Sequence, residues 1–430
     1  MIAFSNAVVL AAVIQMVAPS TGRAATAGEA VTLRQALAEA DAANARLAAA
    51  RFEPRIAAQS VAQSRGSLGP ALSVAGALFA TPPGATYWEG ATAAQSNLQL
   101  ELRQPLYEGG ALRGQLNADE ASLRAARFRL EADRDDVALE VRSRFSEVLG
   151  DDQVVDARKA GLARLQTYVA FVQARKASGA PIELDLLRIR ARITDDEANL
   201  AAAERASQES RIELNVLMGR DPMSALVLAP LSEPGAPPRF RSNGVVPDVA
   251  AAEAQQQSAQ GRAQVASSVR RPHLAFIATA GLIDAGLGAP GAPAGFGSRL
   301  RDDFGATFGL QVSWDLWNMG ALSAQVEKAR LEAAQASAAM TQARTQADLA
   351  RERAAAEVRL RFDELASRLK AVPTARDAYL VAQSLYRGGT GTSLDVLDAY
   401  RTLLDAEIAA AEATFQARVA EATLLRWTPG

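Results

Sequence analysis

The chain has 430 residues, a nearly balanced charge of 46 basic and 48 acidic residues, and no cysteine. The charge balance excludes a typical nucleic-acid binder, and the lack of cysteine excludes disulfides, thiolate metal sites, thiol nucleophiles and a lipid-modified N-terminal cysteine. Hydrophobic residues make up 49% of the chain but aromatic residues only 5%. This composition is typical of long, closely packed helices rather than of a thick globular core.

The first 27 residues resemble an export signal. They contain the apolar stretch AVVLAAVIQMVA, followed by the small-residue cleavage site Ala25-Thr26-Ala27. No Lys or Arg precedes the apolar stretch, so a cytoplasmic chain with a stray apolar N-terminus is the alternative. Beyond this segment no apolar run reaches the ~18 residues of a transmembrane helix. We therefore expect a signal peptide over 1–27.

The remaining sequence contains an internal duplication. The segments QPLYEGGALRG (104–114) and SWDLWNMGALS (313–323) share an aromatic residue followed three positions later by Gly-Ala-Leu. An ungapped offset of 210 residues aligns these motifs and also aligns Asp185 with Asp395. Because two separated motifs agree on one offset, the sequence predicts two copies of one structural unit.

The duplication divides the chain into a first repeat over 28–218, a Pro-rich connector over 219–246 and a second repeat over 247–430. Each repeat predicts a helical segment, two strands, a long helix, a short glycine turn and a returning helix. In the first repeat the helical segment, strands and long helix are expected at about 32–65, 68–80, 96–107 and 110–176. In the second repeat they are expected at about 247–270, 272–283, 304–317 and 320–387.

The long helices show coiled-coil spacing. At ~1.5 Å per residue each would measure roughly 100 Å, too long for the interior of a compact domain. Apolar residues recur every seven positions, which predicts helices packed side by side; the series are Val141, Val148, Val155, Leu162 and Val169, and Val358, Leu365, Val372, Tyr379 and Tyr386. An ordinary coiled coil explains these helices equally well, but it does not explain the strands.

The predicted strands alternate strictly between apolar and polar residues. In NLQLELRQPLY, Leu98, Leu100 and Leu102 lie on one face, and residues 304–317 extend the same pattern. The pattern is typical of a membrane β-barrel; a half-buried strand of a soluble sandwich is the alternative. Four strands are too few for such a sandwich, and a single-chain barrel needs at least ~8. Because lipid does not tolerate an open sheet edge, several chains would have to share one barrel.

The duplicated plan and the segment YRGGTGTSLDVLDAYRTLLDAE (386–407) resemble the TolC-type outer-membrane factors of Gram-negative bacteria. The resemblance implies a fold that is mainly α with a β-barrel part. It implies a homotrimer with a shared twelve-stranded transmembrane β-barrel and a trimeric α-barrel tunnel, located in the outer membrane with a long periplasmic part. The implied partners are outer-membrane lipid, a periplasmic adaptor protein and an inner-membrane pump of the RND or ABC type. No nucleic-acid partner is expected.

The loop GGTGTSLDVLD predicts the tip of a helical hairpin. Thr392 is placed to cap the following helix, with Asp395 as its capping-box partner. Gly388, Gly389 and Gly391 permit the backbone angles of a tight reversal.

The first repeat has a corresponding turn. Gly179 there permits the reversal, and Pro181 suits the first position of the returning helix.

The resemblance also implies a gate at the tips. Asp395 and Asp398 correspond to an acidic ring at the periplasmic entrance, which would favour cations. Tyr386 corresponds to a tyrosine that ties the inner hairpin shut, and Asp185 to its carboxylate partner. The family's arginine in the turn is replaced by Gly391, so we expect a reduced closing network. For Asp398 the alternative is a solvated helix face.

Nothing in the sequence predicts an enzyme or a cofactor. His273 is the only histidine, with no nucleophile motif near it, and a metal site would need several His or Cys ligands. Three functions remain: the passive exit duct of a tripartite efflux pump or type I secretion system, a periplasmic adaptor, and a structural cytoplasmic coiled coil. An adaptor has one hairpin, and a coiled coil does not explain the strands. The sequence therefore favours the exit duct.

Overall fold

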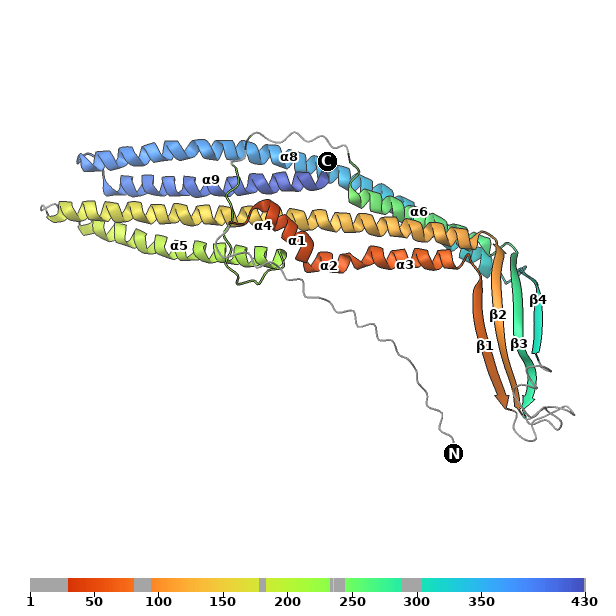
Figure 1. Ribbon diagram of the computed structural model, residues 1–430. Coiled ribbons are helices and arrows are strands. Elements are labelled where there is room, and N and C mark those ends of the chain that lie inside the picture. Colours follow the sequence, from red (N-terminus) through yellow and green to blue (C-terminus); the bar gives the residue numbers. More distant parts are fainter. Residues whose placement is uncertain are drawn as a thin grey trace, which may run out of the picture.

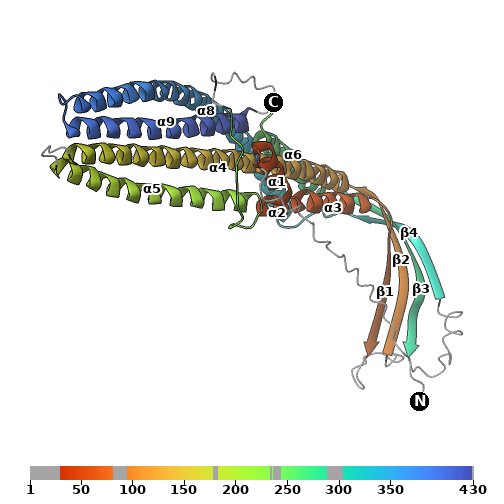
Figure 2. The same ribbon diagram turned by 60° about the vertical axis from the view of Figure 1, so that its left-hand side comes forward.

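The computed structural model describes residues 30–80, 94–177, 183–232, 235, 244–287 and 304–428. The predicted signal segment 1–27 lies outside the described residues, as do Gly179 and Pro181. Figures 1 and 2 show an elongated molecule with long helices side by side and a sheet at one end, set at an angle to the helices.

The duplicated plan is confirmed by the helices. Helices α4 (Ala111–Ala177) and α8 (Ala321–Arg387) have 67 residues each, and the returning helices α5 (Glu183–Leu217) and α9 (Ser393–Trp427) have 35 each. Both ends of α8 and both ends of α9 lie 210 residues beyond the corresponding ends of α4 and α5. None of the helices in the described ranges is long and apolar enough to cross a membrane.

Helix α4 is the central element of the protein. It packs against α5 and α9 in the half remote from the sheet, and against α3 and α6 near the sheet (Figure 1). Its heptad residues Val141 and Val148 are fully buried, together with Phe145 between them. Beside this stripe the side chains are partly exposed, and Arg144 pairs with Glu147 at 2.6 Å. The predicted coiled-coil spacing thus gives one buried stripe along a long helix.

The shorter helices are α1 (Leu33–Ala43), α2 (Ala45–Ala50), α3 (Phe52–Gly66) and α6 (Pro247–Ser268). The prediction of one helical segment over 32–65 was wrong, because the chain breaks at Asn44 and Arg51. Asn44 has extended backbone angles, and its side-chain oxygen accepts hydrogen bonds from the N–H groups of Arg46 and Leu47. Its amide also donates to the Leu217 carbonyl at 3.0 Å, so this break holds the end of α5.

The first part of the predicted connector lies against the N-terminal segment. Val31 donates to the Val227 carbonyl at 2.8 Å, and Ala229 donates back to the Val31 carbonyl at 2.9 Å. Gly219, with φ of +71°, follows the end of α5 as a helix terminator.

The sheet has four antiparallel strands in the order β1-β2-β3-β4. They are β1 (Ala71–Ala80), β2 (Ala94–Glu108), β3 (His273–Leu287) and β4 (Phe304–Ser313). The prediction that the last strand continues to Trp317 was wrong. Ser313 is the last residue of β4 with a partner, because it pairs with His273, the first residue of β3. Beyond it the Trp314 indole N–H donates to the Arg270 carbonyl at 3.1 Å.

One face of the sheet is apolar and uncovered by the rest of the chain. The register places Val74 beside Leu100, and Leu100 beside Ala280, so the apolar positions line up across neighbouring strands. Phe308 on β4 is 82% exposed, although a large apolar side chain is normally buried in water-soluble protein. The other exposed apolar residues of this face are Leu72, Leu98, Phe304, Leu310 and Val312.

Candidate functional site

The tip of the second hairpin is a compact turn between α8 and α9. The backbone N–H groups of Thr390 and Gly391 both donate to the Leu385 carbonyl, at 3.0 and 3.1 Å. Of the three predicted turn glycines, Gly389 alone has a positive φ, +79°. Gly391 meets a different requirement, because a Cβ there would lie 3.0 Å from the Leu385 Cβ. A side chain at the position of the family's arginine would therefore require the neighbouring residues of the turn to shift.

Asp395 closes the capping box that the sequence predicts. Its carboxylate accepts hydrogen bonds from the Thr392 hydroxyl at 2.7 Å and the Thr392 N–H at 2.8 Å, and its own N–H donates to the Thr392 hydroxyl at 3.2 Å. These hydrogen bonds lower the pKa of the Asp395 carboxyl, so it keeps its negative charge to lower pH than a free aspartate. The side chain is exposed at the start of α9, where a negative charge also favours the helix dipole.

Asp398 lies one turn further along α9. Its side chain is exposed and makes no hydrogen bond or ion pair with any other described residue. Its backbone carbonyl accepts a hydrogen bond from the side-chain hydroxyl of Thr402, four residues further along the helix, at 3.0 Å. The part of the chain that the structure describes therefore gives this carboxylate no structural partner.

Tyr386 and Asp185 are brought together by the fold. The Tyr386 hydroxyl donates to Asp185 Oδ2 at 3.1 Å, which joins the end of α8 to the start of α5. The Tyr386 ring is buried, with the rings of Tyr168 and Phe171 edge-on at 5.5 and 6.2 Å. The hydrogen bond therefore links the two hairpins from within a packed aromatic cluster.

Sequence reasoning missed two further links between the hairpins. Arg164 on α4 forms a two-pronged ion pair with Glu407 on α9, at 2.8 and 2.9 Å. Tyr400 on α9 donates to Asp196 on α5 at 2.7 Å, and both side chains are buried. The partners lie 243 and 204 residues apart in the sequence. No local pattern marks either pair.

The sole histidine lies at the other end of the molecule. His273 starts β3, and its Nδ1 lies 2.6 Å from the carboxylate of Glu108 at the end of β2. The pair joins two neighbouring strands where the sheet meets the helices. Within the described residues there is no group of three or more His, Cys, Asp or Glu that could hold a metal ion.

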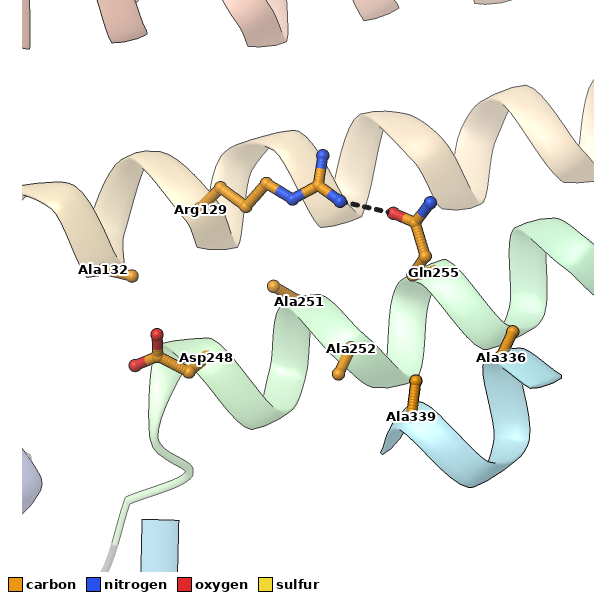
Figure 3. Close-up of a pocket in the computed structure, with 8 residues that line it drawn as sticks. All are labelled: Arg129, Ala132, Asp248, Ala251, Ala252, Gln255, Ala336 and Ala339. Atoms are coloured by element: carbon orange, nitrogen blue, oxygen red, sulfur yellow. Dashed lines mark hydrogen bonds between the residues drawn. The ribbon is translucent and has the colours of Figure 1, made fainter. Parts of the chain in front are cut away.

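A cavity of about 320 Å³ lies between α4, α6 and α8 (Figure 3). Alanines form most of its lining. Its polar side chains already have partners: Arg129 donates to Gln255 at 2.7 Å, and Asp248 accepts from Arg426 at 2.8 Å. The cavity therefore resembles a gap between small side chains rather than a site with convergent polar groups for a ligand.

The outer membrane efflux protein family matches residues 33–220 and 245–428, most of the described structure. The chain belongs to this family. The family relative BepC, an outer membrane efflux protein of Brucella suis biovar 1 (strain 1330), is 24% identical over 433 residues, covering 98% of this chain and 89% of that protein.

Solved channel structures have the same fold. The outer-membrane channel OprN has a TM-score of 0.79 at 22% identity, over 93% of this chain and 90% of that one. VceC from Vibrio cholerae has a TM-score of 0.79 at 19% identity, over 93% of this chain and 96% of that one. These likenesses confirm the predicted fold class, mainly α with a β-barrel part. Family membership confirms the main functional prediction, an outer-membrane efflux channel that is passive and not an enzyme, and does not support the adaptor alternative.

Proposed function

We propose that three copies of this chain assemble into one exit duct that crosses the outer membrane and extends through the periplasm. The observation that carries the proposal is the sheet. Its outer strands β1 and β4 each have one neighbour among the described residues, and its apolar face is uncovered. An open edge is not tolerated in lipid, so the edges must pair with other copies. Three sheets of four strands give a closed twelve-stranded barrel.

The helices supply the periplasmic part of the duct. At ~1.5 Å per residue, the 67-residue helices α4 and α8 are about 100 Å long. They place the hairpin tips at the end of the molecule remote from the sheet (Figure 1). In this arrangement the barrel contacts outer-membrane lipid, and the tips meet a periplasmic adaptor protein fed by an inner-membrane pump of the RND or ABC type. Each copy in this arrangement comprises two repeats, over 28–218 and 247–430, joined by the connector 219–246.

The tips form the gate of the proposed duct. On a threefold axis, Asp398 and Asp395 would each be repeated as a ring of carboxylates at the entrance. Such rings favour cations, and at a Debye length of ~8 Å neighbouring charges in a narrow ring are little screened. The lack of a partner among the described residues supports this role for Asp398, and the Tyr386–Asp185 hydrogen bond supports closure of the same entrance.

The test is single-channel recording of the full chain in planar bilayers. A trivalent cation on the tip side should block the current, and the Asp398→Ala, Asp395→Ala double variant should lose the block and its cation selectivity. Asp405→Ala is the matched control, because Asp405 is also an exposed aspartate on α9 but lies seven residues further from the tip, beside Arg401. This control should keep the block.

The pH dependence separates the two rings. Since the pKa of Asp395 is lowered, the block that remains in Asp398→Ala should persist to lower pH than a free aspartate would allow. A double variant with unchanged block and selectivity would contradict the gate. A folded monomer in detergent, with no trimer by mass measurement, would contradict the assembly itself.

A further inference from the structure

Tyr400 forms a buried link that reaches from one hairpin to the other. Its hydroxyl on α9 donates to Asp196 Oδ2 on α5 at 2.7 Å, and the two residues are only 1% and 2% exposed. Asp196 is the only fully buried carboxylate residue in the described part of the chain. Since buried carboxylates are costly unless they are paired and hydrogen-bonded, this contact needs an explanation beyond ordinary packing.

The link passes across α4, which lies between the two helices that it joins. Helices α5 and α9 scarcely touch each other, whereas α4 packs against both. The gap is provided by Gly161 on α4, where an added Cβ would lie 2.8 Å from the Tyr400 hydroxyl oxygen. A glycine inside a helix is less favourable than alanine, and the passage of the Tyr400 side chain explains why glycine stands at this position.

The surroundings keep Tyr400 as the donor. Burial raises the pKa of the Tyr400 hydroxyl, and the hydrogen bond to Asp196 raises it further, so the proton stays on Tyr400. Arg192 lies 3.1 Å from Asp196 Oδ1 and balances its charge, with its guanidinium carbon 5.9 Å from the centre of the Tyr400 ring. Tyr400 nevertheless makes the only hydrogen bond to the Asp196 carboxylate within the described residues.

We propose that the Tyr400–Asp196 hydrogen bond, with Gly161 as its passage, is a second closing contact of the gate, which we call the deep tie. This inference rests on the proposed gate at the tips. Asp185 and Asp196 are 11 residues apart on α5, which places the deep tie about 16 Å further from the tip than the Tyr386–Asp185 contact. Separation of α9 from α5 would leave a buried carboxylate without its hydrogen-bond donor, so the deep tie favours the closed arrangement.

The deep tie also accounts for closure without the family's turn arginine. Gly391 stands at that position, where a side chain would crowd Leu385 and require it to shift. Asp185 is only partly buried, so water competes for its hydrogen bond with Tyr386. Asp196 is fully buried, so water does not compete for its hydrogen bond with Tyr400. The duplication did not produce the deep tie twice, because the positions 210 residues away from Asp196 and Tyr400 are Ala406 and Arg190.

The test is single-channel recording of the full chain with Tyr400→Phe, which removes the hydroxyl and keeps the ring. A buried hydrogen bond to a charged group changes an equilibrium by about tenfold or more, so the ratio of open to closed time should rise by at least that factor. Tyr379→Phe is the matched control. Tyr379 lies in the same buried cluster, on α8, and its hydroxyl makes no hydrogen bond within the described residues. This control should leave the ratio unchanged.

Two further variants separate a closing contact from a merely structural one. Asp196→Leu removes the acceptor and should open the channel, and adding Tyr400→Phe to it should have little further effect, because both remove the same bond. Gly161→Ala should also open the channel by displacing the hydroxyl, even if Tyr400→Phe fails to assemble. Single-channel records report assembled trimers only, so lower yields do not distort the ratio.

The outcomes distinguish the deep tie from the proposed function. If the wild-type chain conducts and stays mostly closed, but Tyr400→Phe and Gly161→Ala both match the Tyr379→Phe control, the deep tie is refuted and the channel stands. If the wild-type chain forms no channel, the proposed function fails first, and the deep tie fails with it.

Discussion

Arg426, near the end of α9, provides a quantitative test of the contacts that hold the second hairpin (α8 and α9) to α4 and α6. Its side chain is 3% exposed, and it pairs with Asp136 on α4 at 2.7 Å and Asp248 on α6 at 2.8 Å. Asp135 lies 4.0 Å away, and its pKa is raised, first by burial and then by the neighbouring carboxylates, against the lowering effect of Arg426. This guanidinium therefore faces three acidic side chains from two helices, of which Asp136 also pairs with Arg46 at 3.2 Å.

Arg426→Leu should destabilise the protein by about 2 kcal/mol at pH 7. Removing one partner of a fully buried ion pair costs roughly 3–5 kcal/mol. The three carboxylates here are 42–43% exposed, so water solvates them in part and about half of that cost remains. The pKa of Asp135 is already raised above its unfolded value, and without the lowering effect of Arg426 it rises further. The destabilisation is then present above the unfolded pKa of ~4 and disappears as the pH falls below it.

The assay is thermal unfolding followed by helical circular dichroism, at one scan rate, at pH 7 and at pH 4. Arg418→Leu is the control, because Arg418 lies on the same helix and donates to the Ser232 carbonyl rather than to a carboxylate. Arg426→Leu should lower the midpoint more than this control at pH 7 and by a smaller margin at pH 4. Equal midpoints at pH 7, or a margin that does not shrink at pH 4, would refute the charge-balance reasoning.

Two predictions concern the tip turn. Gly389→Ala should destabilise the turn by about 1 kcal/mol because the position has a positive φ, whereas Gly388→Ala, at φ −74°, should be tolerated. The rates of protease cleavage at the tip compare the two variants, and equal rates would contradict the requirement for glycine at position 389. Gly391→Arg should raise resting conductance rather than lower it, since its Cβ would crowd Leu385; a channel that closes more tightly would show instead that the family's arginine contact can be restored.

The fold was predictable from the sequence because its signals are local or repeated. Heptad spacing and strand alternation each report which side of an element is buried, and the 210-residue offset marks the same boundaries twice. The errors arose where a distant partner decides the structure. The break at Asn44 serves a contact to Leu217, and β4 ends at Ser313 because β3 offers no further residue to pair with.

The candidate site was only partly predictable. The Thr392–Asp395 capping box is a local pattern, and the structure confirms its hydrogen bonds. The Tyr386–Asp185 pairing was expected from the family resemblance and not from spacing, since the partners are 201 residues apart. Tyr400 lacked both kinds of signal, because its partner is remote and its repeat position differs.

The differences between the two repeats explain how one duplicated plan produces two kinds of hairpin. Aligned at the 210-residue offset, both returning helices have an aspartate in their first turn, Asp185 and Asp395. Three residues later the repeats diverge, because Arg188 aligns with Asp398. The second tip therefore has an exposed acid, with no partner among the described residues, at the position where the first has an exposed base.

The same divergence sets the direction of the closing contacts. At both ties the hydroxyl comes from the second repeat, as Tyr386 and Tyr400, and the carboxylate comes from the first, as Asp185 and Asp196. A tyrosine in such a pair loses its partner only if the two hairpins separate. A motion within either hairpin leaves both bonds intact. The charges that would select ions thus lie on the second hairpin, and both tyrosine hydrogen bonds that oppose its movement cross to α5.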